Sequence, residues 1–234
     1  MRINIRQACC LLTMLTALSR LAVAQDVNDI GQWNAVFMQD KIAADSKVRW
    51  WFDGHYRLFE DNDGFGQSIV RPGLGLDISK NSALWAGYGW IRTSPIQGND
   101  TDEHRIWQQW TWSETAKPFK FALRTRFEQR QLESSDDTGL RLRQFVRCQK
   151  TLDRCATRTF VVWDEMFIAL NDTDFGQRDG FDQNRLFVGF GFKRFRNSTW
   201  RAEIGYMLQS INQQGPSNRH NHILALNIFR SPTR

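Results

Sequence analysis

The chain has 234 residues and a formal net charge of +6, from 31 Lys and Arg against 25 Asp and Glu. Its basic residues are spread along the chain instead of forming a patch or stripe, which argues against a nucleic-acid-binding protein. No run of 18 apolar residues occurs after residue 24, so no transmembrane helix is expected there. Ten Trp and 17 Phe are many for a soluble domain of this size, and membrane barrels use such residues in interfacial girdles.

The first residues have the order of a secretory signal peptide. Two arginines precede an apolar run at residues 8–18, and Ala22-Val23-Ala24 has the small-residue pattern of a cleavage site. We therefore expect residues 1–24 to be removed, the mature protein to begin near Gln25, and residues 25–234 to form one β domain. An exported chain of this kind is periplasmic, extracellular or a membrane barrel.

Apolar and polar residues alternate along most of the mature chain. In residues 119–130, for example, Phe121 and Phe127 fall on one side of an extended chain, and Arg126 and Glu128 fall on the other. No helical pattern of similar strength occurs. Eleven alternating segments are recognised in chain order, at roughly 30–39, 47–59, 67–78, 83–93, 103–113, 118–131, 139–149, 158–169, 182–194, 199–210 and 219–229.

The connections between these segments alternate in length. Those at 79–82 and 196–198 are tight, whereas the longer, polar ones lie around 94–102, 132–138, 170–181 and 210–218. Short turns on one rim and long loops on the other are typical of outer-membrane barrels, although an ordinary meander is an alternative. Bacterial single-chain barrels have even strand numbers, so we expect ten or twelve strands, with one hidden near residues 25–32 or one segment divided wrongly.

The length of the segments distinguishes a barrel from a sandwich. Soluble strands usually have five or six residues, whereas these are long enough for a tilted strand to cross a bilayer. A sandwich would have to bury nearly all the apolar faces in one thin core, including Trp50, Trp90, Trp110, Trp112 and Trp200. The sequence thus predicts a single antiparallel transmembrane β-barrel of about 10–12 strands. A soluble, secreted β-sandwich that binds a partner is the alternative.

The polar faces of the segments are rich in long charged side chains. In a barrel they would crowd the lumen, where buried charges persist only when they are paired. We favour a structural salt-bridge network that plugs the barrel over a narrow, charge-lined pore or an anion-binding lumen, which the excess of arginine also allows. The residues expected in this network are Arg49, Asp53, Arg57, Arg71, Glu103, Arg105, Arg124, Arg126, Glu128, Arg130, Arg141, Arg143, Arg147, Glu165, Arg185, Arg201 and Glu203.

An ordered set of motifs resembles a known family. The motifs occupy residues 102–109, 124–130, 140–143, 163–167, 181–185 and 203–206, and read DEHRIWQQ, RTRFEQR, LRLR, WDEMF, FDQNR and EIGY. Over about residues 30–229 the chain resembles the bacterial family called domain of unknown function 2490. The resemblance implies an outer-membrane location and no established activity. The expected partners are outer-membrane lipid, lipopolysaccharide and the barrel-assembly machinery, with no nucleic acid.

Two cysteines remain after residue 24. Cys148 and Cys155 lie close together in sequence near an expected turn, and an exported protein meets an oxidising compartment. We expect a disulfide between them, with two free thiols as the alternative. No further Cys or His lies nearby to complete a metal site.

The candidate catalytic groups are the four histidines, His55, His104, His220 and His222. His55 shares a face with Asp53, and Ser68 starts the next segment, while His220 and His222 follow Ser217. Neither arrangement has a recognisable triad spacing. A lipid-modifying barrel enzyme is therefore the second hypothesis, without assigned catalytic residues.

Metal and cofactor sites have weak support. His220 and His222 share one strand face but lack an evident third ligand, and loop-mouth polar residues are the favoured reading. Acidic loops at 61–64, 99–102 and 171–174 do not complete a calcium-loop pattern. We predict no metal and no cofactor.

Overall fold

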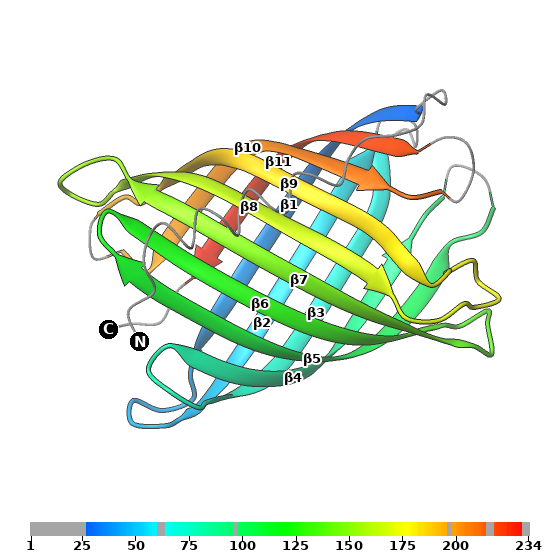
Figure 1. Cartoon of the computed structure of the whole chain (residues 1–234), viewed down its shortest axis with the longest axis horizontal. Helices are drawn as coiled ribbons and strands as arrows, with labels where there is room; N and C mark the ends of the chain where they lie inside the picture. The colour runs from blue at the N-terminus through cyan, green and yellow to red at the C-terminus, as the bar shows by residue number, and fades with distance from the viewer. Residues whose placement is uncertain (1–26, 60–63, 96–97, 196–197, 214–217, 231–234) are drawn as a thin grey trace.

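In a computed structural model, the chain folds into one closed β-barrel (Figure 1). The structure describes residues 27–59, 64–95, 98–195, 198–213 and 218–230. Among these residues no helix is long and apolar enough to cross a membrane. The eleven strands are β1 (Val27–Lys41), β2 (Val48–Phe59), β3 (Gly64–Asp77), β4 (Ser82–Thr93), β5 (Thr101–Ala116), β6 (Phe119–Leu132), β7 (Thr138–Thr151), β8 (Arg158–Ala169), β9 (Gly180–Phe192), β10 (Trp200–Ile211) and β11 (Arg219–Arg230).

The closed barrel confirms the predicted all-β fold and overturns the sandwich alternative. Each strand pairs antiparallel with the strand before it, and the sheet closes where β1 pairs with β11. That last pair is parallel, from Val27 opposite Arg219 to Met38 opposite Arg230. The expectation of an even strand number is therefore wrong. A parallel closing pair satisfies both edges of an odd-numbered sheet, so the eleven segments of the sequence are eleven strands.

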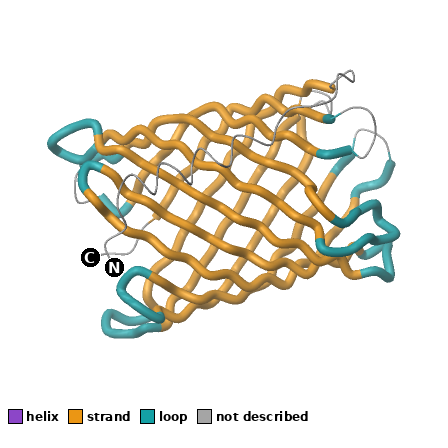
Figure 2. Tube along the Cα trace, viewed as in Figure 1, coloured by secondary structure: helices purple, strands orange, loops and turns teal. Residues whose placement is uncertain are grey.

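The connections lie at two rims, which the loops mark at opposite ends of the tube in Figure 2. The short-turn rim carries residues 42–47, 78–81, 117–118, 152–157, 193–195 and 198–199, together with the end of β11. The long-loop rim lies where β2, β4, β6, β8 and β10 end and where β1 starts, and its described loop residues are 94–95, 98–100, 133–137, 170–179, 212–213 and 218. The segment between β8 and β9 is the longest of these connections.

Alternation assigns the two faces of the sheet. Leu74, Ile106 and Leu224 face outward and are 62%, 55% and 52% exposed, whereas Arg126 and Glu128 face the lumen and are fully buried. Successive side chains of a strand point to opposite faces, so a period-two sequence produces a barrel that is apolar outside and charged inside.

Aromatic side chains fill much of the remaining lumen. The Trp107 ring lies flat over the barrel wall where Gly73 of β3 faces Gly87 of β4. A Cβ atom at either glycine would collide with the ring, so only glycine permits this packing. Trp51 packs edge-on against both Trp107 and Trp85, and Phe187 covers a second glycine pair in β9 and β10.

Candidate functional site in the barrel lumen

Ion pairs join neighbouring strands along the inner wall of the barrel. Glu128 of β6 is fully buried and accepts hydrogen bonds from Arg141 at 2.7 Å and Arg143 at 2.6 Å, both on β7. Arg143 also donates to Glu165 of β8 at 2.8 Å, and Glu165 receives a further bond from Arg124 at 2.6 Å. Arg143 thus bridges two carboxylates, and this chain of charge-assisted bonds joins three neighbouring strands from the inside.

Two further carboxylates extend this arrangement around the wall. Asp53 of β2 accepts from Arg71 at 2.6 Å and from the Trp51 indole at 2.8 Å, and the Nε2 atom of His55 lies 3.2 Å from the same oxygen that Arg71 bonds. Glu203 of β10 accepts a hydrogen bond from Arg147 and forms an ion pair with Arg201 at 2.9 Å. Both carboxylates are fully buried, so their charges depend on these partners.

A second group of pairs lies closer to the long-loop rim. Glu103 of β5 pairs with Arg105 at 2.6 Å and with Arg130 of β6 at 2.7 Å. Arg130 also donates to Gln177 of the 170–179 loop at 2.9 Å. Gln177 is only 8% exposed and donates to the backbone oxygen of Leu140, so the longest loop folds inward over this end of the lumen.

We call the set of these charged residues the ionic belt. Its carboxylates are Asp53, Glu103, Glu128, Glu165 and Glu203. Its arginines are Arg57, Arg71, Arg105, Arg124, Arg126, Arg130, Arg141, Arg143, Arg147, Arg185 and Arg201. Every residue expected in the lumen network thus lies on the inner face; Arg49, the remaining one, pairs with Asp77 at 3.3 Å near the short-turn rim.

Arginine exceeds carboxylate in the belt by about two to one, and aromatic rings contact the surplus cations. Arg57 and Arg185 have no carboxylate within ion-pairing distance among the described residues. The guanidinium of Arg57 lies 3.7 Å from the centroid of Trp33, and that of Arg185 lies 4.8 Å from the same ring. Arg126 stacks similarly on Trp107 at 4.6 Å. Cation–π contact offsets part of the cost of burying these charges.

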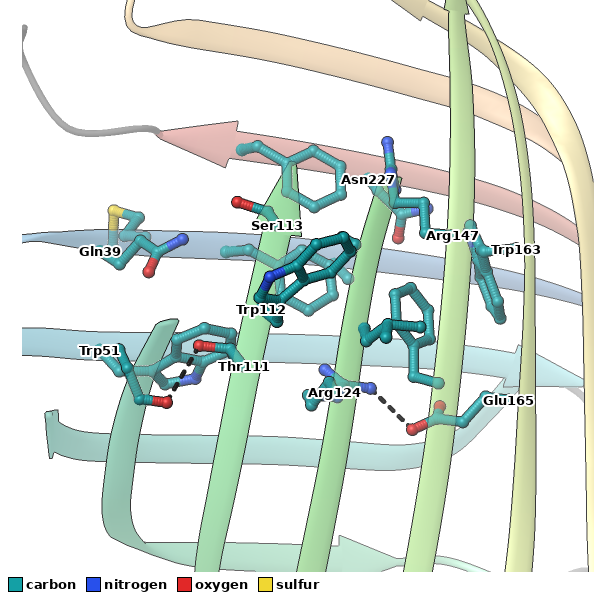
Figure 3. Close-up of a pocket in the computed structure, with 18 of the residues that line it drawn as sticks. Gln39, Trp51, Thr111, Trp112, Ser113, Arg124, Arg147, Trp163, Glu165 and Asn227 are labelled. Carbon is teal, nitrogen blue, oxygen red and sulfur yellow. Dashed lines mark hydrogen bonds and ion pairs between the residues drawn. The ribbon is translucent and has the colours of Figure 1, made fainter. Parts of the chain in front are cut away.

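A cavity of about 560 Å³ occupies the lumen between the ionic belt and the short-turn rim. We call this cavity the vestibule. Its mouth includes Lys41, Lys80 and Arg230, and its inner end is lined by Trp33 and Arg57. No described residue of the long-loop connections lines it. Figure 3 shows side chains from several strands directed into this space, with Arg124 bonded to Glu165 at its edge.

The histidines do not assemble a catalytic triad among the described residues. His55 faces the lumen and contacts Asp53, but Ser68 is opposite the outward Tyr56 and therefore lies on the other face of the wall. His104 and His222 face outward and hydrogen-bond to tyrosine hydroxyls of the neighbouring strands. His220 contacts Ser210 at 3.0 Å, and Ser217 lies outside the described residues.

The carboxylates of the acidic loops at 99–102 and 171–174 form hydrogen bonds and ion pairs with neighbouring side chains. Hydrogen bonds from Ser94 and Arg92 hold the pKa of Asp100 below its ordinary value. Asp172 pairs with Arg178 at 3.5 Å, while residues 61–63 lie outside the described part of the chain. No cluster of three His, Cys, Asp or Glu side chains suited to a metal ion occurs in the described residues.

The expected disulfide between Cys148 and Cys155 is not formed. Cys148 lies within β7, three residues before its end at Thr151, whereas Cys155 lies in the exposed turn that follows. Extended chain rises by about 3.3 Å per residue, so Cys148 lies roughly 10 Å below the turn, beyond the roughly 7 Å limit between disulfide-bonded Cα atoms. Closeness in sequence was a poor guide because the strand continues through Cys148.

Inward-facing tryptophans are the part of the site that the sequence reading missed. Trp51 lies between Arg49 and Asp53 in the same alternating series, and Trp107 follows Arg105 by two residues. Their position in the series, rather than their polarity, would have placed them in the lumen.

Comparison with known proteins gives a family and no activity. A family model described as "Protein of unknown function (DUF2490)" matches residues 30–221. An uncharacterized protein of Methylorubrum extorquens is 36% identical over 165 residues, which cover 70% of this chain and 72% of that protein. No solved structure matches. On the family match, together with this relative, the chain belongs to the DUF2490 family of proteins of unknown function.

Proposed function

We propose that this protein is an outer-membrane β-barrel whose lumen is closed to the passage of solutes. The observation that carries the proposal is the ionic belt, in which Arg143 links Glu128 to Glu165 across the inside of the wall. Fully buried carboxylates with several arginine partners leave no continuous aqueous path at that level. A water-filled pore would instead solvate these groups.

The outer face supports a membrane location. Its exposed side chains include Leu74, Ile106, Phe190 and Leu224, which a water-soluble protein would not expose around its whole circumference. Strands of a dozen residues, tilted by roughly 40°, rise about 30 Å along a barrel axis, which is enough for an apolar band about 25 Å tall. Outward aromatic residues lie towards both rims, with Trp50 and Trp200 near the short turns and Tyr56 and Trp90 near the long loops.

A membrane location also implies how the protein reaches the outer membrane and how the barrel is oriented in it. Residues 1–24 would direct export, and the assembly machinery would insert the barrel with the short-turn rim and the end of β11 towards the periplasm. Outer-membrane lipid and lipopolysaccharide would then surround the apolar band. In this reading the protein is not an enzyme, and its role is performed by the barrel wall and by the vestibule.

Conductance in a planar bilayer tests the closed lumen. The purified mature protein should insert without producing current steps. Glu128→Ala removes a carboxylate that anchors Arg141 and Arg143, so it should be the variant most able to open a path. Glu133→Ala, which alters an exposed residue of the 133–137 loop, is the matched control. Steady ion-selective current through the parent protein would contradict the proposal and favour a narrow, charge-lined pore.

A further inference from the structure

We propose that the vestibule is a binding site for an amphipathic anion, a molecule with one acidic head and an apolar or aromatic body. This inference goes beyond the closed lumen, because it concerns what the cavity binds and not what the barrel conducts. The first observation that supports it is the charge of the residues that line the cavity. Among the described residues, only two that line the vestibule are acidic, Asp77 and Glu165. Its basic residues are Lys41, Arg49, Arg57, Arg71, Lys80, Lys120, Arg124, Arg143, Arg147, Arg185, Arg201 and Arg230.

The inner end of the vestibule has the features of an anion site. Arg57 is buried, with only 7% of its surface exposed, and its Nε atom has no hydrogen-bond partner among the described residues. The guanidinium groups of Arg57 and Arg185 contact the same Trp33 ring, at 3.7 and 4.8 Å from its centroid. Both groups line the vestibule. Two neighbouring cations that have no carboxylate partner among the described residues would be stabilised by a ligand that brings negative charge.

Arg185 strengthens this conclusion. The carboxylate of Glu165, which also lines the vestibule, is already bonded by Arg124 and Arg143 at 2.6 and 2.8 Å. The hydrogen bonds of Arg185 go to the neutral Gln183 instead. The ring of Trp33 contacts both Arg57 and Arg185, and its indole N–H also has no acceptor among the described residues. An acidic head placed here would receive guanidinium and indole donors together.

The walls of the vestibule indicate the rest of the ligand. Phe37 and Phe229 stack with ring centroids 4.9 Å apart, and Phe145 packs against Trp163 at 5.5 Å. These four rings line the same cavity as the arginines. A site for a small inorganic anion would have no need of such walls, whereas apolar surfaces with a few polar groups are typical of small-molecule pockets.

The dimensions fit an elongated molecule. Lys41 at the mouth and Trp33 at the inner end are both on β1, eight residues apart, so the vestibule is about 20 Å deep for a strand tilted by roughly 40°. Its volume lies within the usual range of ligand pockets, about 300–1,000 Å³. A ligand would enter through the short-turn rim and place its acidic head at Arg57 and Arg185.

A matched pair of dyes tests the proposal. Anilinonaphthalenesulfonate and phenylnaphthylamine share one aromatic body, and only the former carries a sulfonate. With the mature protein in phosphatidylcholine nanodiscs, and empty discs as the blank, we expect saturable fluorescence enhancement with the sulfonate and at least about tenfold weaker binding of the neutral dye. Equal binding of the two dyes, or no saturable binding, would overturn the proposal.

Variants locate the head group. Arg57→Gln and Arg185→Gln should each weaken binding of the sulfonate by about tenfold or more, which is the effect expected from one lost hydrogen bond to a charged group. Both should unfold at the same or a higher urea concentration than the parent, since each removes a buried cation that lacks a carboxylate partner. Arg178→Gln, which removes an exposed cation at the opposite rim, should leave binding unchanged. Unchanged affinity in both lumen variants would refute the assignment.

Competition in the unaltered protein identifies the source of the anion and needs no variant. Dodecanoate should displace the sulfonated dye, and dodecanol should not. If phosphatidylglycerol in the disc also displaces the dye, the vestibule accepts an anionic membrane lipid; if only dodecanoate does, it accepts a free amphiphile. Displacement by dodecanol as effective as that by dodecanoate would show that charge is irrelevant and would overturn the proposal.

Discussion

Replacement of Glu128 by Ala is the most direct test of the ionic belt. The carboxylate is fully buried and accepts three hydrogen bonds, two from Arg141 at 3.1 and 2.7 Å and one from Arg143 at 2.6 Å. Breaking a buried ion pair by removal of one partner costs roughly 3–5 kcal/mol, because the remaining charge is left uncompensated. Arg143 keeps Glu165, and Arg141 keeps Asp182 at 3.2 Å. By contrast, Arg126, 3.8 Å from Glu128, keeps only the neutral Gln109 as a hydrogen-bond partner among the described residues. We therefore expect a loss of about 3–4 kcal/mol.

The measurement is equilibrium unfolding in urea, followed by tryptophan fluorescence of the barrel in micelles. Glu133→Ala is the control, since Glu133 is 62% exposed in its side chain and contacts only His104 among the described ion-pair partners. An exposed pair contributes about 0–1 kcal/mol, so the control should unfold close to the parent. If both variants lose less than about 1 kcal/mol, water must reach Glu128 and its arginines, and the view of the belt as a dry plug is wrong.

Three further predictions concern location, packing and orientation. The mature protein should begin near Gln25 and sediment with the outer membrane after salt washing, as judged by N-terminal sequencing and density-gradient fractionation; recovery from the soluble periplasm would contradict this. Gly87→Ala should destabilise the barrel by roughly 1–3 kcal/mol, because its Cβ meets the Trp107 ring and the Pro72 carbonyl oxygen, while Gly54→Ala, where a Cβ makes only ordinary contacts, should be nearly neutral in the same urea titration. Cys155 is exposed at the short-turn rim, so a bulky, impermeant maleimide should label it only after the outer membrane is opened; Ser134→Cys at the other rim, made with Cys155→Ala, should label in intact cells, and the reverse pattern would invert the proposed orientation.

The faces of the strands could be predicted from the sequence because they depend on a local period of two. Arg126 and Glu128 fall on the inner face whichever strands lie beside β6, and they are fully buried there. The parity of the strand number is different in kind. It depends on whether β1 meets β11 parallel or antiparallel, and no local pattern in either strand records that choice.

The inner end of the vestibule could not be predicted for a related reason. Trp33, Arg57 and Arg185 come from β1, β2 and β9, and only the closure and curvature of the barrel bring the two guanidinium groups to one ring. Lumen residues were also predicted from their charge, so the tryptophans that lie on the same strand faces were left out of the prediction. The prediction of a disulfide was wrong because the chain from Cys148 to Cys155 first continues along β7 before it turns.

The parallel pair of β1 and β11 has a consequence for how the barrel opens. Its partners are about 190 residues apart along the chain, so this pair carries the largest loop-closure cost, whereas the other strand pairs are closed by connections of a few residues. Parallel ladders are also slightly less stable per residue than antiparallel ones. The seam should therefore be the last strand pair to form and the first to separate. Amide hydrogens in the β1–β11 ladder should exchange faster than those in the ladder of β6 and β7, and a lateral gap in the wall, if one opens, should appear at this seam.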